Sequence, residues 1–266
     1  MRIVTPLIAT PVSHLFEDKV AAHEISEVSD CLEARERTAE LQFEKQWLFH
    51  IDIDLPHNWG HKIKEYLRDN LSLKPELKLV TLQASRVCEG LVVEGGIAQL
   101  SGKIYSETEM IQNAKKNVDW LRNTLGDEVK IGMENNNYYP TKAYDIVTSG
   151  EFISELIESC NIHLLLDIAH AMVTAHNMRL NYSEYIATLP LNRLIQLHIC
   201  QPNIPESSIV ATDAHEVPDD LMIQHARQLS EQYKSIEYLT IEYYKDKNLL
   251  IDSINKLREA FMADSI

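Results

Sequence analysis

Short apolar runs bounded by polar or turn residues alternate along the chain with longer amphipathic stretches. This alternation is typical of repeated strand–helix units whose strands form a buried parallel sheet. The runs predict eight strands, at residues 2–8, 23–29, 47–53, 77–83, 129–134, 162–168, 193–199 and 236–242. Eight strands with intervening helices predict an α/β fold of the (β/α)8 TIM barrel type. A doubly wound open sheet is the alternative.

The helix signals are clearest between the fourth and fifth predicted strands. Ser106 stands three residues before Glu109, which is the capping-box pattern of a helix start, and Gly126 suits the helix end. Further helices are expected within residues 144–160 and 247–262.

Two connections, residues 84–105 and 200–216, are long, and long loops in a compact domain are more often functional than not. The chain has no internal repeat and no linker rich in proline, glycine or serine. We therefore expect residues 1–266 to form a single TIM-barrel domain.

Charge and composition exclude several partners. The chain has 40 acidic and 25 basic residues, a net charge of −15, and no run of lysine or arginine, so we expect no nucleic-acid partner. Much of the acidity is expected on solvated helix faces, as in residues 24–45. No stretch approaches the roughly 20 apolar residues that span a bilayer, and we expect a cytoplasmic protein without membrane contact. The cysteines lack CxxC spacing and are expected to be buried free thiols: Cys31, Cys88, Cys160 and Cys200.

Potential metal ligands close four of the predicted strands: Glu134, Asp167, His198 and Glu242. The carboxyl ends of barrel strands meet at one face, so these side chains are expected to lie together there. An ionisable residue that ends an apolar run is costly to bury unless a metal or a partner satisfies it. For Asp167 the alternative is a helix N-cap, with His170 in the first turn of that helix.

Other candidates surround this series. Asp213 and His215 have a chelating spacing if the segment is extended, and His50 lies near the end of the third predicted strand. The fourth ends at Gln83, which is a poor metal ligand compared with histidine. Residues expected to line the site are Asn135, Tyr138, Cys200 and Tyr243, although aromatic packing is an alternative for the tyrosines.

In this order the candidates resemble the trinuclear site shared by endonuclease IV-type barrels and by the DUF692 family, the multinuclear non-haem iron-dependent oxidative enzymes (MNIO). Both belong to the xylose isomerase-like TIM barrels. Three segments resemble the DUF692 family more closely: MENNNYY at 133–139, LLLDIAHAMVTAHN at 164–177 and TDAHEVPDDL at 212–221. The resemblance is good over residues 129–245 and poor over residues 1–128.

The departures from the family pattern concern three strand ends. At the sixth, Ala169 or His170 replaces an asparagine often seen near the aspartate. Gln83 stands where the pattern has a histidine, and His198-Ile199-Cys200-Gln201 replaces a His-x-Ala-Gly segment.

The resemblance implies a ligand set for three ions. Glu134 would bridge two metals, and Asp167, His198 and Glu242 would complete one of them. A second would be held by His170, Asp213 and His215. His50 and Glu134 would form a third, with Gln83 in place of its histidine. The implied cofactor is two or three iron ions, with zinc or manganese as alternatives because affinity alone does not select among them.

The same resemblance implies an oxidoreductase that uses dioxygen to modify a residue, commonly cysteine, of a ribosomally synthesised peptide in natural-product (RiPP) biosynthesis. A separate recognition domain or partner protein would present the peptide. Three alternatives remain: a metal-dependent hydrolase of the endonuclease IV type, which the charge of −15 disfavours, a sugar isomerase, and a degenerate barrel that acts as a binding subunit. Gln83 and the divergent first half favour the last of these.

Overall fold

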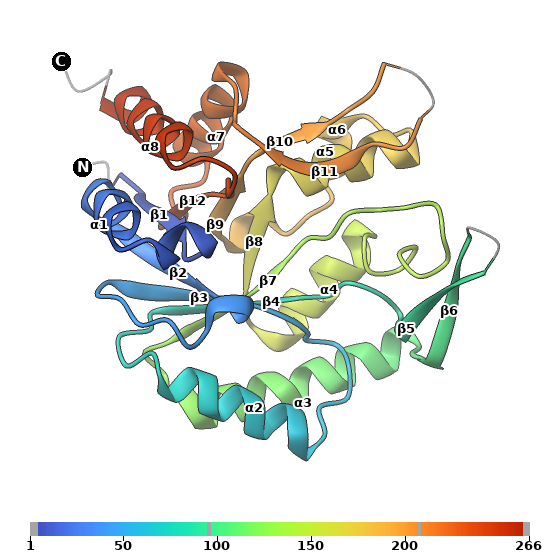
Figure 1. The fold of residues 1–266 in the computed structure, drawn as a ribbon. Helices are drawn as coiled ribbons and strands as arrows, with labels where there is room; N and C mark the ends of the chain where they lie inside the picture. Colours follow the sequence, from blue (N-terminus) through green and yellow to red (C-terminus); the bar gives the residue numbers. More distant parts are fainter. Residues whose placement is uncertain (1–4, 95–96, 207–208, 263–266) are drawn as a thin grey trace.

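The computed structural model describes residues 5–94, 97–206 and 209–262 (Figure 1). Within them, parallel strands close into an eight-stranded barrel in the order β1-β12-β9-β8-β7-β4-β3-β2. The strands are β1 (Leu7–Pro11), β2 (Cys31–Arg35), β3 (Gln46–Asp54), β4 (Leu79–Gln83), β7 (Lys130–Glu134), β8 (His163–Asp167), β9 (Leu194–Ile199) and β12 (Tyr238–Ile241). Because β1 pairs with both β12 and β2, the sheet has no open edge. The predicted TIM barrel is confirmed, and the open sheet is excluded.

Helices follow the strands and pack around the outside of the barrel (Figure 1). They are α1 (Lys19–Val28), α2 (His61–Ser72), α3 (Glu107–Leu125), α4 (Gly150–Cys160), α5 (Ile168–Met178), α6 (Tyr182–Ile186), α7 (Asp220–Gln232) and α8 (Lys247–Met262), with short 3-10 helices at His14–Glu17, Glu36–Thr38 and Leu191–Arg193. None of the helices in the described ranges has the length and apolar character needed to cross a membrane.

The strands are apolar over most of their length because both faces of a parallel barrel sheet are covered. In β8, for example, Leu164, Leu165 and Leu166 are completely buried. The strands end in polar residues at the mouth of the barrel, where Glu134 and Asp167 are the last residues of β7 and β8. The fold therefore brings the ligand candidates to one end. All four cysteines are free and buried, as predicted.

The second strand was predicted wrongly. Residues 23–29 belong mostly to α1, whose buried residues Ala21, Ala22 and Ile25 recur at helical spacing, and Asp18 caps its start by accepting from the amides of Val20 and Ala21. The strand is β2, at residues 31–35. The charged segment 24–45 is therefore not only a solvated helix face, since it contains a buried strand of the barrel.

Two other boundaries differ from the prediction. The helix expected within residues 144–160 begins at Gly150, because the Ser149 hydroxyl caps it and turns precede it. The first strand, expected at 2–8, is β1 at residues 7–11, and residues 1–4 lie outside the described residues. By contrast, the capping box of Ser106 and Glu109 is present at the start of α3.

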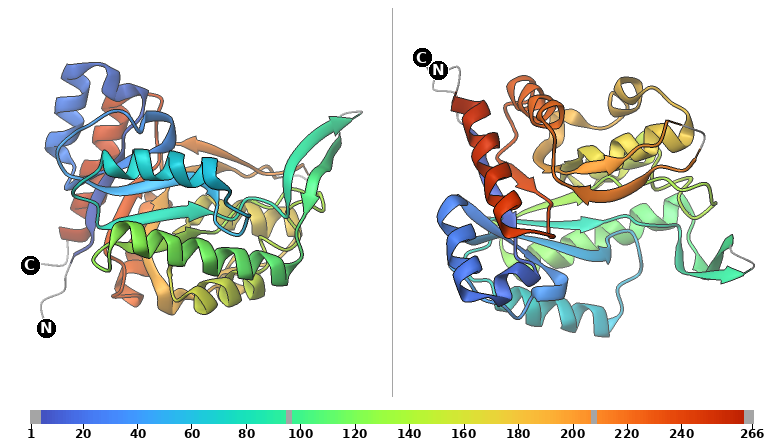
Figure 2. Two further views of the ribbon diagram at one scale, coloured as in Figure 1. Left: turned by 90° about the horizontal axis from the view of Figure 1, so that it is seen from below. Right: turned by 45° about the horizontal axis from the view of Figure 1, so that its top comes forward.

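The two long connections are largely β-hairpins rather than irregular loops. Strands β5 (Cys88–Glu94) and β6 (Ile97–Ile104) pair antiparallel, and so do β10 (Gln201–Asn203) and β11 (Thr212–Glu216). The β5–β6 hairpin projects away from the barrel (Figure 2). The β10–β11 hairpin brings Asp213 and His215 to the site described next.

Candidate metal centre

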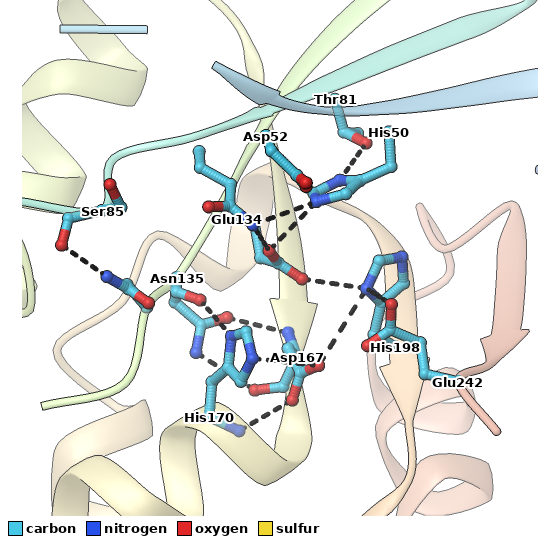
Figure 3. A network of polar contacts seen from close by, with 12 residues as sticks. His50, Asp52, Thr81, Ser85, Glu134, Asn135, Asp167, His170, His198 and Glu242 are labelled. Atoms are coloured by element: carbon cyan, nitrogen blue, oxygen red, sulfur yellow. Dashed lines mark hydrogen bonds and ion pairs between the residues drawn. The ribbon is translucent and has the colours of Figure 1, made fainter. Parts of the chain in front are cut away.

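The four strand-end candidates come together at the mouth of the barrel. Ligand atoms of Glu134, Asp167, His198 and Glu242 all lie within 4.8 Å of one another, and all four side chains are buried. Figure 3 shows Glu134 between His50 and His198, with Asp167 and His170 close by. Four elements that are distant in the sequence (β7, β8, β9 and the residue after β12) therefore contribute to one cluster.

His198 presents one ring nitrogen to this cluster. Its Nδ1 lies 2.9 Å from Oε1 of Glu134, 3.4 Å from Oε1 of Glu242 and 4.0 Å from Oδ2 of Asp167, yet it makes no hydrogen bond of normal geometry. Its Nε2 lies 3.2 Å from a carboxylate oxygen of Glu33. Because a carboxylate accepts, Glu33 keeps a proton on Nε2, and Nδ1 is the nitrogen that faces the three carboxylates. Burial alone would lower the pKa of His198, but the carboxylates of Glu242, Glu33 and Glu134 raise it well above its usual value in the metal-free protein.

Asp167 acts as a helix cap and also faces the cluster. Its Oδ1 accepts from the backbone amide of His170 at 2.7 Å, while Oδ2 is buried without a hydrogen-bond partner. The two interpretations of Asp167 therefore do not compete, since each uses a different oxygen. Burial, together with the carboxylates of Glu242 and Asp213, raises the pKa of Asp167 to about 7 despite the opposing effect of His170.

Asn135 holds this corner of the site in place. Its side-chain oxygen accepts from the Asp167 amide at 2.8 Å, and its amide nitrogen donates to the Asp167 carbonyl at 3.1 Å. Its own carbonyl accepts from Nδ1 of His170 at 2.8 Å. The Nδ1 proton of His170 is thereby fixed, and Nε2 is left to face Oδ2 of Asp213 at 3.2 Å. Asn135 supports the ligands rather than lining the cavity.

A second group of candidates lies toward the entrance. Nδ1 of His215 is 3.3 Å from Oδ2 of Asp213, and its Nε2 is 3.4 Å from Oε2 of Glu242. The backbone of His215 has a φ of 45°, in the left-handed region that is uncommon for residues other than glycine. Such a conformation costs energy and occurs often at functional sites.

The third group contains His50, Gln83 and Glu134. Nε2 of His50 lies 3.4 Å from Oε2 of Glu134 and 3.4 Å from Nε2 of Gln83, while its Nδ1 lies 3.0 Å from the hydroxyl of Thr81. Gln83 thus lies beside these two potential ligands, with an amide where the family resemblance implies an imidazole.

The sequence analysis did not identify two candidate site residues on β2, Glu33 and Arg35. Glu33 is completely buried and contacts His198, and Arg35 forms ion pairs with Glu33 (2.6 Å) and Glu242. Burial alone would raise the pKa of Glu33, but Arg35 and His198 lower it to about 2. The sequence did contain a pattern that could have indicated this strand: Glu33 and Arg35 alternate with the apolar residues Leu32 and Ala34, as on a strand with one polar face.

The predicted tyrosines occupy different places. Tyr243 is buried in the hydrophobic core, whereas the next residue, Tyr244, donates from its hydroxyl to Oε1 of Glu242 at 3.0 Å and lines the cavity. The side chain of Tyr138 contacts that of Asp145, and the residue does not line the cavity.

The cavity at the barrel mouth has a volume of about 780 Å³. The predicted site residues that line it are His50, Gln83, Glu134, His170, Asp213, His215 and Glu242.

The donor set fits divalent transition metals. Imidazole nitrogens and carboxylate oxygens are ligands that iron, zinc and manganese accept. Two buried atoms with no hydrogen bond, Nδ1 of His198 and Oδ2 of Asp167, face the same cluster of oxygens. A bound cation would satisfy both atoms and offset the burial and the neighbouring carboxylates that raise the pKa of Asp167.

The fold and this ligand cluster together define a (β/α)8 TIM barrel with potential metal-binding side chains at its mouth. The sequence model described as "RiPP precursor modification enzyme MbnB/TglH/ChrH" matches residues 102–249, more than half of the chain. The protein belongs to this family, whose name refers to modification of the precursors of ribosomally synthesised peptides. The resemblance found in the sequence is confirmed.

Individual relatives support the family and the fold. A "UPF0276 protein" of Caulobacter vibrioides is 30% identical over 89 residues, which is 34% of this chain and 32% of the relative, so the match spans about a third of that relative's length. The 3-keto-D-glucoside 4-epimerase YcjR from E. coli superposes with a TM-score of 0.63 at 12% identity, covering 96% of this chain and 99% of the other. The D-allulose 3-epimerase from Methylomonas sp. does so with a TM-score of 0.56 at 13% identity, covering 97% of each chain. At these identities the structures share the fold alone.

Proposed function

We propose that this protein is a dioxygen-dependent oxidative enzyme that modifies a residue, with cysteine as the first candidate, of a ribosomally synthesised peptide. One observation carries the proposal. In a chain of the RiPP precursor modification family, the strand-end residues Glu134, Asp167, His198 and Glu242 converge, and two of their atoms lack hydrogen bonds. The cofactor proposed is two or three iron ions.

The first ion would be held by Glu134, Asp167, His198 and Glu242, because their ligand atoms lie within 4.8 Å of one another. The second would be held by Nε2 of His170 with Asp213 and His215. The third would have His50 and the other oxygen of Glu134 as ligands. With Gln83 beside them instead of histidine, this third position has the weakest donor set of the three.

Bound iron would supply the redox chemistry that couples reduction of dioxygen to oxidation of the peptide. The chain's own residues would orient the ligands and admit the substrate. Glu33 and the Asn135 carbonyl hold the outer nitrogens of His198 and His170, so that the inner nitrogens face the centre. In the metal-free site, Arg35 and Tyr244 both donate to Oε1 of Glu242 and hold that carboxylate in place.

The cavity suits a peptide side chain rather than a nucleic acid. Its volume of about 780 Å³ lies in the range of small-ligand sites, and Arg37 and Arg86 line it beside the acidic Glu17, Glu36 and Asp52. A duplex would face a protein with a net charge of −15. We propose that a separate recognition domain or partner protein presents the peptide to this mouth.

The test begins with anaerobic reconstitution. Protein purified without oxygen is loaded with Fe²⁺, its bound iron is counted, and it is mixed with dioxygen and a short cysteine-containing peptide encoded beside its gene. The expected result is dioxygen consumption and a change in peptide mass that an Asp167→Ala variant does not produce. Zinc-loaded protein that cleaves phosphodiesters without consuming dioxygen would point instead to the hydrolase class. Binding of less than one metal ion per chain would rule out both.

A further inference from the structure

Cys200 is the residue that follows β9, two positions after His198. Side chains two residues apart on a strand point to the same face, and Gln196, His198 and Cys200 follow this spacing. All three are completely buried. Gln196 contacts Glu33 deep in the barrel, and His198 faces the carboxylate cluster. The thiol of Cys200 is therefore the next group toward the mouth.

The surroundings of this thiol are metal ligands. Ligand atoms of Cys200, His215 and Glu242 lie within 4.8 Å of one another, and the thiol donates to Oδ1 of Asp213 at 3.7 Å. These residues come from different parts of the fold: the end of β9, the β10–β11 hairpin and the residue after β12. Cys200 therefore belongs to a three-element ligand group rather than standing alone.

A buried carboxylate oxygen without a hydrogen bond is connected to this group through His170 and Asp213. Oδ2 of Asp167, which is completely buried, has no hydrogen-bond partner and lies 3.7 Å from Nε2 of His170. That nitrogen is 3.2 Å from the other oxygen of Asp213, Oδ2. The carboxylates of Asp167 and Asp213 thus approach the same imidazole, and Asp213 also accepts from the thiol.

The other cysteines are placed differently. Cys31 packs in a small apolar cluster, Cys160 ends α4, and Cys88 donates to the carbonyl of Gly90. Among the ligand groups found in the described part of the chain, Cys200 is the cysteine that takes part. Cys200 thus differs from the other three cysteines because its thiol lies next to potential metal ligands.

We propose that Cys200 supplies a thiolate ligand to the second metal ion, the one assigned above to Asp213 and His215, with Glu242 also within reach. The inference deepens the proposed function and depends on its metal centre. On binding, the thiol releases its proton to solvent and the sulfur forms a bond to the ion, with no change of oxidation state. A thiolate among imidazole and carboxylate favours iron, cobalt or zinc over magnesium or calcium.

X-ray absorption of the zinc-loaded full-length protein tests this directly. A coordinated thiolate gives a sulfur scatterer at about 2.3 Å from zinc, whereas nitrogen and oxygen ligands lie at about 2.0–2.2 Å. We expect the sulfur scatterer in the wild type and in the matched control Cys160→Ser, and its loss in Cys200→Ser and in Cys200→Ala. Bound zinc is counted by equilibrium dialysis in every sample.

The outcomes separate this inference from the proposed function. Zinc bound by the wild type with nitrogen and oxygen ligands alone would overturn the role of Cys200 and leave the metal centre intact. A sulfur scatterer that persists in the Cys200 variants would overturn it equally. A wild type that binds no zinc, cobalt or iron would overturn both. If a variant fails to fold, the wild-type spectrum alone still shows whether sulfur coordinates the zinc.

Discussion

Oε2 of Glu33 lies 3.2 Å from Nε2 of His198, and both side chains are completely buried inside the barrel. A carboxylate behind a ligating histidine fixes the ring and makes its other nitrogen a better donor. We therefore expect Glu33→Gln to weaken metal binding about 10- to 100-fold without removing a ligand. Titration of metal-free protein with Zn²⁺ in a calorimeter measures the change in Kd.

The matched control is Glu237→Gln. Glu237 pairs with Lys130, and both side chains are more than a third exposed, so its charge does not act on the site. The control should keep the wild-type Kd. If Glu33→Gln also keeps it, then other contacts orient His198, and the support assigned to Glu33 is wrong.

The difference between Glu33 and the other candidates explains what the sequence could predict. Glu134, Asp167 and His198 end or nearly end apolar runs, and in a parallel barrel such ends meet, so local pattern was enough to bring them together. Glu33 meets His198 only because the barrel closes, and the two are 165 residues apart. No short-range sequence pattern could therefore predict the contact between Glu33 and His198.

Two other failures have local causes. The strand that carries Glu33 was missed because the preceding residues, including Ala21 and Ile25, form a helix whose apolar side resembles a short strand run. Tyr243 and Tyr244 are adjacent and alike in sequence, yet the first packs in the core and the second binds Glu242. Only the geometry of the chain after β12 separates them.

Asp167 should make the metal-free protein less stable as the pH rises. Burial and neighbouring carboxylates raise its pKa from 3.8 to about 7, so the folded state binds more protons than the unfolded state between these values. The contribution of Asp167 to stability therefore falls from about pH 4 to about pH 7. Asp167→Asn keeps an oxygen for the helix cap but removes this penalty.

We expect the metal-free Asp167→Asn variant to exceed the wild type in free energy of unfolding by a few kcal/mol at pH 8, with the difference disappearing near pH 4. Urea unfolding of chelator-treated proteins across this range measures it. Asp220→Asn, in the first turn of α7, is the control and should show no such trend. An equal difference at all pH values would contradict the assignment to Asp167.

Arg35 should stabilise the metal-free site and oppose metal binding. Burial alone would raise the pKa of Glu242, but Arg35 is the main group that holds this pKa well below its usual value. A metal ion would compete with Arg35 for the same carboxylate. Arg35→Gln leaves buried carboxylates without their counter-charge, which should cost the metal-free protein about 3–5 kcal/mol. Zn²⁺ should then restore more stability than it adds to the wild type.

Urea unfolding with and without Zn²⁺ tests both halves of this expectation. Arg37→Gln is the matched control, because Arg37 is exposed on the 3-10 helix after β2 and still lines the cavity. The control should respond to zinc as the wild type does. A smaller zinc response in Arg35→Gln than in the wild type would mean that Arg35 helps to hold the ion instead.

Gln83 should limit how many ions the site holds. Its amide nitrogen lies 3.4 Å from Nε2 of His50 and 3.5 Å from Oε2 of Glu134, so a histidine in its place would add an imidazole to two potential ligands already present. Imidazole binds divalent transition metals far better than a neutral amide. We expect Gln83→His to bind one more iron ion per chain than the wild type, counted after anaerobic reconstitution and desalting.

Two variants make this prediction specific. Gln83→Asn changes the length of the side chain but adds no imidazole, and its metal content should equal that of the wild type. Adding His50→Ala to Gln83→His should abolish the gain, because the new position would lose its other histidine while Glu134 remains. A gain that survives the loss of His50 would locate the extra ion elsewhere in the cavity, and the third group of ligands would have to be reassigned.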